Sequence, residues 1–73
     1  MKWKQFFGRV RSMTAHEARA YINKKKEGDY TLLDVREPGE YKTAHIPGAK
    51  LIPLSQLPDR LGELDPGKPL ITY

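Results

Sequence analysis

The chain has 73 residues, a formal net charge of +4 and no cysteine. A chain of this length forms one domain at most, and without cysteine it can hold neither a disulfide nor a thiolate-bound metal. Its two histidines, His16 and His45, are far apart in the sequence and make a poor metal-ligand set, so we expect no metal and no cofactor.

The sequence predicts no membrane-spanning segment. It contains no run of about 18 apolar residues, which is the length a transmembrane helix needs. Its first eight residues also lack the apolar core of a secretory signal peptide. We therefore expect a cytoplasmic protein with no membrane partner.

Charge is unevenly distributed along the chain. Residues 1–26 carry eight Lys or Arg against one acidic residue, a net charge of +7, whereas residues 27–73 carry five against eight, a net charge of −3. A basic half could bind nucleic acid or anionic lipid. However, Lys24, Lys25 and Lys26 lie where cations complement the C-terminus of a helix, so a solvated surface explains them better. We therefore disfavour a nucleic-acid partner.

The beginning of the chain is predicted to divide into a basic lead-in segment, residues 1–11, and the domain proper, residues 12–73. Four residues of the lead-in, Trp3, Phe6, Phe7 and Val10, are spaced so that part of the segment could dock on the domain or on a partner. We expect the lead-in itself to be loosely ordered.

A first helix is predicted from Thr14 to Gly28. Thr14 and Glu17 have the spacing of a capping box, in which each side chain satisfies a backbone donor of the other residue. Apolar residues then recur with helical periodicity, and Gly28 follows the lysine run as a helix-ending residue.

The remaining elements alternate between strands and helices. Residues 30–35, 50–52 and 69–73 are short apolar runs that predict strands. Pro38 is placed to start a single helical turn. Ser55 is a candidate N-cap for an amphipathic helix with four apolar positions, Leu54, Leu57, Leu61 and Leu64.

This alternation favours an α/β fold with a parallel sheet flanked by helices. Three strands and two helices would leave one face of the sheet, and one edge of the last strand, uncovered. Buried parallel strands do not tolerate such exposure, so we interpret the chain as part of a larger domain.

The most informative residues are LLDVREPGEY at 32–41 and AHIPGA at 44–49. Together they resemble the first half of a rhodanese-type sulfurtransferase domain. The resemblance covers roughly residues 12–73, with Ala44 standing where the family usually has glycine. It implies a rhodanese-like α/β fold that is incomplete in this chain, which would form the amino-terminal portion.

The resemblance also implies a reaction. In the family a nucleophilic cysteine follows the strand that corresponds to residues 70–73, and backbone N–H groups at a helix N-terminus stabilise its thiolate or persulfide. That cysteine takes sulfane sulfur from a small anionic donor such as thiosulfate and passes it to a thiol or cyanide. We expect the cysteine just after Tyr73, and we predict that the 73 residues alone contain no catalytic residue and are inactive.

Asp34 and Arg36 are the candidate substrate-binding residues. Asp34 ends a strand, where it could accept loop N–H groups, pair with a cation or shape the electrostatics of a site. Arg36 could attract an anionic donor or form an ion pair with Asp34, Glu37 or Glu40. We expect His45 to hydrogen-bond loop backbone and not to act as a general base.

Two other functions compete with sulfur transfer. A non-enzymatic rhodanese-like docking or regulatory module would have the same fold, and the residue after Tyr73 distinguishes it from an enzyme. A nucleic-acid or anionic-surface binder would use residues 1–26, and binding that weakens steeply with salt would reveal it. The sequence specifies neither the physiological sulfur donor and acceptor nor the oligomeric state.

Overall fold

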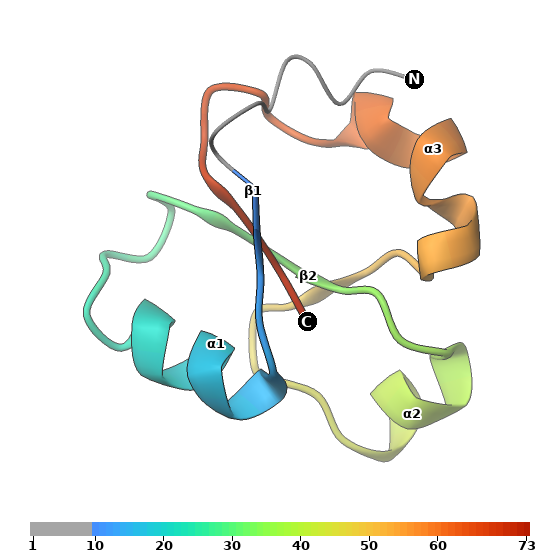
Figure 1. The fold of residues 1–73 in the computed structure, drawn as a ribbon, viewed down its shortest axis with the longest axis horizontal. Helices are drawn as coiled ribbons and strands as arrows, with labels where there is room; N and C mark the ends of the chain where they lie inside the picture. The colour runs from blue at the N-terminus through green and yellow to red at the C-terminus, as the bar shows by residue number, and fades with distance from the viewer. Residues whose placement is uncertain (1–9) are drawn as a thin grey trace.

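A computed structural model describes residues 10–73, which form a four-stranded parallel sheet in the order β1-β4-β2-β3 (Figure 1). The strands are β1 (Val10–Ser12), β2 (Thr31–Asp34), β3 (Lys50–Leu51) and β4 (Leu70–Thr72). The expected parallel α/β architecture is thus confirmed. The aromatic residues of the lead-in, Trp3, Phe6 and Phe7, lie outside the described residues.

Strand β1 was not expected from the sequence. Val10 and Arg11 belong to the segment that we had assigned to a loosely ordered lead-in, yet they pair in parallel with Leu70 and Ile71 of β4. Strand β4 is therefore an inner strand, and the expectation that its outer edge stays open is wrong. Three residues with one apolar side chain give too little periodicity to predict a strand.

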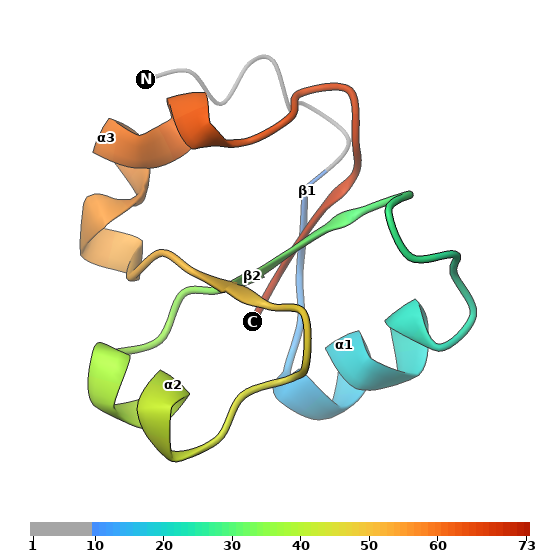
Figure 2. The same ribbon diagram turned by 180° about the vertical axis from the view of Figure 1, so that it is seen from behind.

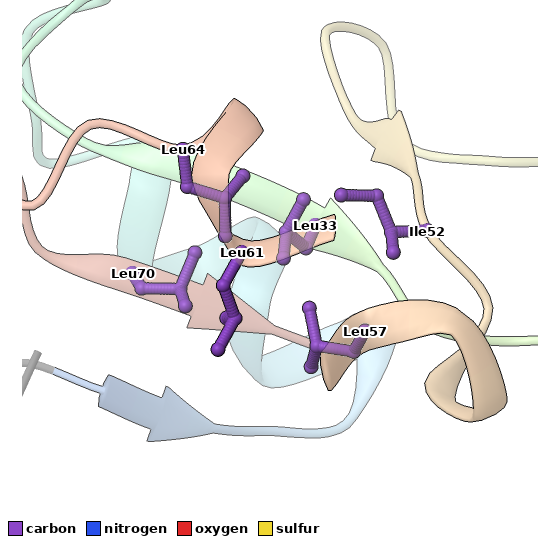
Figure 3. Packing of buried hydrophobic residues seen from close by; sticks show 6 residues of the cluster. All are labelled: Leu33, Ile52, Leu57, Leu61, Leu64 and Leu70. Carbon is purple, nitrogen blue, oxygen red and sulfur yellow. The ribbon is translucent and has the colours of Figure 1, made fainter. Parts of the chain in front are cut away.

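Buried side chains cover both faces of the sheet, which contradicts the expectation of one uncovered face. Successive residues of a strand point to opposite faces. One face carries a cluster of Leu33, Ile52, Leu57, Leu61, Leu64 and Leu70 (Figure 3). The opposite face carries Ala18, Leu32, Ile46, Ala49, Ile71 and Tyr73. In both ribbon views, helices α1 and α3 lie on opposite sides of β2 (Figures 1 and 2).

Helix α1 (Ala15–Ile22) begins as predicted but ends earlier. The Thr14 N–H donates to Glu17 Oε1 at 2.9 Å, and the Glu17 N–H donates to Thr14 Oγ1 at 3.1 Å. The N–H groups of residues 24 and 25 bond carbonyls three residues back, a tightening that is typical of helix ends. The chain then turns at Gly28, with φ of +93°, to enter β2.

Helix α2 (Pro38–Thr43) starts at its proline as predicted. The expected amphipathic helix is instead three short pieces, η2 (Leu54–Gln56), α3 (Leu57–Arg60) and η3 (Leu61–Glu63). Pro58 lacks a backbone donor and Gly62 costs helix stability, so neither favours one continuous helix.

Three of the four predicted apolar positions of this segment are buried. Leu57, Leu61 and Leu64 belong to the core, whereas Leu54 is 65% exposed. The prediction that Ser55 is an N-cap is wrong. Ser55 lies inside η2, and no side chain caps α3. Within residues 10–73, no helix is both long enough and apolar enough to cross a bilayer.

Candidate functional site at the carboxyl edge of the sheet

Strands β2 and β4 deliver the candidate residues to the same edge of the sheet. The two strands are parallel neighbours, so their carboxyl ends lie side by side. Pairing continues beyond β4, because the Tyr73 N–H donates to Leu33 O at 3.1 Å and the Val35 N–H donates to Tyr73 O at 2.9 Å. Ligands of open α/β sheets bind at this edge, beyond the carboxyl ends of the strands.

Asp34 is buried and engages Arg36 through both carboxylate oxygens. Its Oδ1 accepts the Arg36 backbone N–H at 2.9 Å and Nε at 3.0 Å, and its Oδ2 accepts Nη2 at 2.8 Å. Arg36 Nη2 also donates to Ala44 O at 2.6 Å. The pair therefore fixes the chain as it leaves β2 and ties it to the loop that follows α2.

Both members of this pair are held in their charged forms. Burial by itself raises the pKa of Asp34, but the hydrogen bonds from the Arg36 side chain and backbone outweigh it and lower that pKa below its ordinary value. The hydrogen bond to Asp34 likewise raises the pKa of Arg36. Neither group is therefore suited to exchange protons near neutral pH.

Tyr73 closes the site on the side of α1. It is 8% exposed, and its hydroxyl oxygen accepts the Ile46 N–H at 3.0 Å. The Arg36 guanidinium carbon lies 5.5 Å from the centre of its ring, within the range of a cation–π interaction. Burial raises the pKa of Tyr73, which keeps the phenol protonated.

The loop after α2 is fixed by aromatic and backbone contacts. His45 Nδ1 lies 2.8 Å from Tyr41 O, so His45 contacts backbone as expected, but that of α2 and not of the loop. The His45 and Tyr41 rings stack with centroids 3.7 Å apart, and the Tyr41 hydroxyl donates to Ala49 O at 2.8 Å. Gly48 has φ of +90°, a conformation that favours glycine, whereas Ala44 is extended and tolerates any side chain.

Among the partners considered for Arg36, the structure selects Asp34. Glu37 and Glu40 form a capping box at the start of α2 instead, with the Glu37 N–H donating to Glu40 Oε1 at 3.1 Å. The contact between Tyr73 and Ile46 was not predicted, because the two residues are 27 positions apart and no local pattern links them.

An apolar hollow of about 390 Å³ lies at the same edge, lined mainly by Val10, Met13, Val35, Leu54, Leu57 and Tyr73. It lies on the side of the segment that contains α3. Among residues 10–73, no group of three or more His, Asp or Glu side chains gathers to hold a metal ion.

Comparison with known proteins gives the family. The rhodanese-like domain family matches residues 14–73. The HTH-type transcriptional regulator Rv0324 of Mycobacterium tuberculosis is 42% identical over 71% of this chain and 23% of its own length. The uncharacterized protein YqhL of Bacillus subtilis is 42% identical over 88% of this chain and 47% of its own length.

A third relative, an uncharacterized 16.5 kDa protein of Synechococcus elongatus, is 44% identical over 66% of this chain and 31% of its own length. The chain therefore spans less than half the length of each of these relatives. Because the family match covers nearly all of the residues described above, the chain belongs to the rhodanese-like domain family.

Proposed function

We propose that the domain transfers sulfane sulfur through a cysteine that follows Tyr73 in a longer polypeptide. The observation that carries this proposal is the convergence of β2 and β4, which brings buried Asp34, its partner Arg36 and Tyr73 to one edge of the sheet. A residue after Tyr73 would emerge there, beside a cationic side chain and the apolar hollow. The sheet-forming part of the chain, from β1 onward, would be the amino-terminal portion of this domain, because Val10 and Arg11 pair with β4.

The proposed reaction has two steps. The cysteine thiolate attacks the outer sulfur of thiosulfate, the sulfur–sulfur bond of the donor breaks, and sulfite leaves with the electron pair. Cyanide, or a thiolate, then attacks the outer sulfur of the persulfide, which forms thiocyanate or a new persulfide and regenerates the cysteine thiolate. No net oxidant or reductant is required, so no cofactor is proposed.

Two residues of this chain would serve substrate binding. Arg36, whose side chain is 31% exposed, would attract the anionic donor, and Asp34 would hold the guanidinium in place. A dianion such as thiosulfate prefers such a site because a partly buried guanidinium is less screened than a surface charge.

We further propose that the protein acts in the cytoplasm.

The test compares two polypeptides in a thiosulfate:cyanide assay. We expect the 73 residues alone to form no thiocyanate, because they contain no cysteine. We expect a polypeptide extended by the residues that follow in the gene to form thiocyanate, and to lose this activity when its first cysteine after position 73 is replaced by serine. Absence of such a cysteine, or of cyanide-dependent turnover, would refute sulfur transfer.

A non-enzymatic docking or regulatory module is the second candidate. One relative carries the name of a transcriptional regulator, which is the observation that favours it. An extended polypeptide that forms neither persulfide nor thiocyanate, yet keeps the fold, would support this second function.

A further inference from the structure

Strand β1 is the outer strand of the sheet, so one row of its backbone groups faces away from β4. The Met13 N–H donates to Thr72 O at 2.8 Å. In a parallel pair every second residue bonds the partner strand, so the N–H and C=O groups of Val10 and Ser12 point outward. Within residues 10–73, no other strand pairs with this outer row.

A hollow of about 620 Å³ lies between β1 and α1. Its lining includes Arg11 and Ser12 of β1 and Tyr21 of α1. The Tyr21 ring positions two cations, because Arg11 Cζ lies 5.8 Å and Lys25 Nζ lies 5.0 Å from the centre of the ring. We call this hollow the basic groove.

The positive charge of the basic groove is not paired within the described part of the chain. Three exposed cations lie in or beside the groove, and none forms an ion pair with any of residues 10–73; they are Arg11, Lys24 and Lys25. Glu17 is the one acidic residue of the lining, and its Oε1 accepts the Thr14 N–H at 2.9 Å. The groove therefore has a net positive charge, which favours an anionic ligand.

The opposite face of β1 borders an apolar surface. Because side chains alternate along a strand, Val10 and Ser12 point away from the side of Arg11. Both line the apolar hollow of about 390 Å³ beside the segment that contains α3, together with Leu54, which is 65% exposed. A strand added to β1 would therefore meet cations on one face and apolar side chains on the other.

We propose that β1 binds, by strand addition, an extended peptide segment of a partner in which acidic residues alternate with apolar ones. The outer backbone row of β1 supplies main-chain hydrogen bonds, and the alternation directs carboxylates to Arg11 and Lys24 and apolar side chains to the hollow beside Leu54. This interaction goes beyond sulfur transfer and is independent of it.

Other occupants match this edge less well. Pairing of two copies through β1 would bring two Arg11 side chains and two basic grooves together, and such like charges oppose edge-to-edge pairing. A nucleic acid would match the charge, but its phosphate backbone offers no donor to the outward carbonyl groups of β1. An acidic extended peptide satisfies both the charge and the backbone row.

Hydrogen exchange on the 73-residue protein can detect strand addition at a single amide. The probe is a capped peptide of alternating glutamate and valine, long enough to span β1, in about 0.15 M salt. At saturation the outward Ser12 amide should exchange about tenfold more slowly or less, whereas the Met13 amide, already bonded to Thr72 O, should change less. The same peptide with lysine in place of glutamate should not bind.

Two N-methylated peptides test the backbone contact without altering the protein. Backbone groups of a strand alternate between its two edges, so methylation of either the glutamate or the valine amides removes the donors of one edge only. One of the two peptides should lose binding, and the other should keep it. Equal affinity of the two peptides would overturn strand addition.

Charge variants test the basic groove. Arg11→Gln combined with Lys24→Gln should weaken binding about tenfold, since one exposed ion pair contributes up to about fivefold. Lys42→Gln combined with Lys68→Gln is the matched control, because it removes the same charge outside the lining of the groove and should change affinity less than about twofold. Equal losses in the two double variants would overturn the proposal. So would a single-stranded oligonucleotide that binds more tightly than the peptide without slowing Ser12 exchange, or a Ser12 amide already protected by self-association.

Discussion

Replacing Asp34 by asparagine tests whether the ion pair with Arg36 stabilises the fold. Asparagine has nearly the same shape, but it loses the charge and presents an N–H₂ group toward Arg36 Nη2 where Oδ2 accepts at 2.8 Å. The change removes the two charge-assisted hydrogen bonds that Oδ2 of the fully buried carboxyl accepts from Arg36, which we expect to cost about 2–3 kcal/mol of unfolding free energy. A domain of this size has only about 4–10 kcal/mol in total.

Urea unfolding measures this loss directly. For a small domain the free energy of unfolding falls by about 1 kcal/mol per molar urea, so the midpoint should drop by about 2–3 M. Asp29→Asn is the control, because Asp29 is exposed and forms no ion pair among the described residues. It should change the free energy by less than about 0.5 kcal/mol.

The pH dependence gives an independent check on the same ion pair. The folded-state pKa of Asp34 is lowered below its ordinary value of 3.8, so its contribution is fully present above that pH and is lost as pH falls through the lowered pKa. The difference in stability between the unaltered protein and Asp34→Asn should therefore shrink below about pH 4. A midpoint unchanged at pH 7, or a difference independent of pH, would refute a stabilising role for the pair.

Substitutions in the loop and in the core, and a titration of one surface carboxyl, give three further tests. Gly48→Ala should destabilise the fold by about 1–2 kcal/mol because Gly48 has φ of +90°, whereas Gly62→Ala, at a glycine without positive φ, should be neutral or stabilising in urea unfolding. Leu61→Ala should lower the free energy of unfolding by about 2–5 kcal/mol, because Leu61 is 1% exposed. An equal loss for Leu54→Ala, at a residue that is 65% exposed, would contradict this reasoning. Hydrogen bonds from Arg60 lower the pKa of the Glu63 carboxyl to about 2. A carboxyl NMR titration of the protein should find a midpoint near that value and not at 4.5.

Local chemistry explains what the sequence predicted correctly. Two features, the capping box of Thr14 and Glu17 and the start of α2 at Pro38, depend only on neighbours within four residues. The sequence alone therefore predicts them. The strand that ends at Asp34 was predicted for the same reason, since a short apolar run between polar turns specifies it.

Features that depend on distant neighbours were missed. Strand β1 exists because β4, about 60 residues later, offers a parallel partner, and its own three residues show no strand pattern. The lysines after Ile22 are good helix formers, yet the chain leaves the helix there because it must turn back into β2. Tertiary pairing overrides local preference at both positions.

The candidate site shows the same division. The sequence identified Asp34 and Arg36 but left three partners open for the arginine, and geometry alone selects Asp34 over the two glutamates of α2. The contact between Tyr73 and Ile46 carried no sequence signal, because the two residues are 27 positions apart. It follows only from the packing of the loop after α2 against the end of β4.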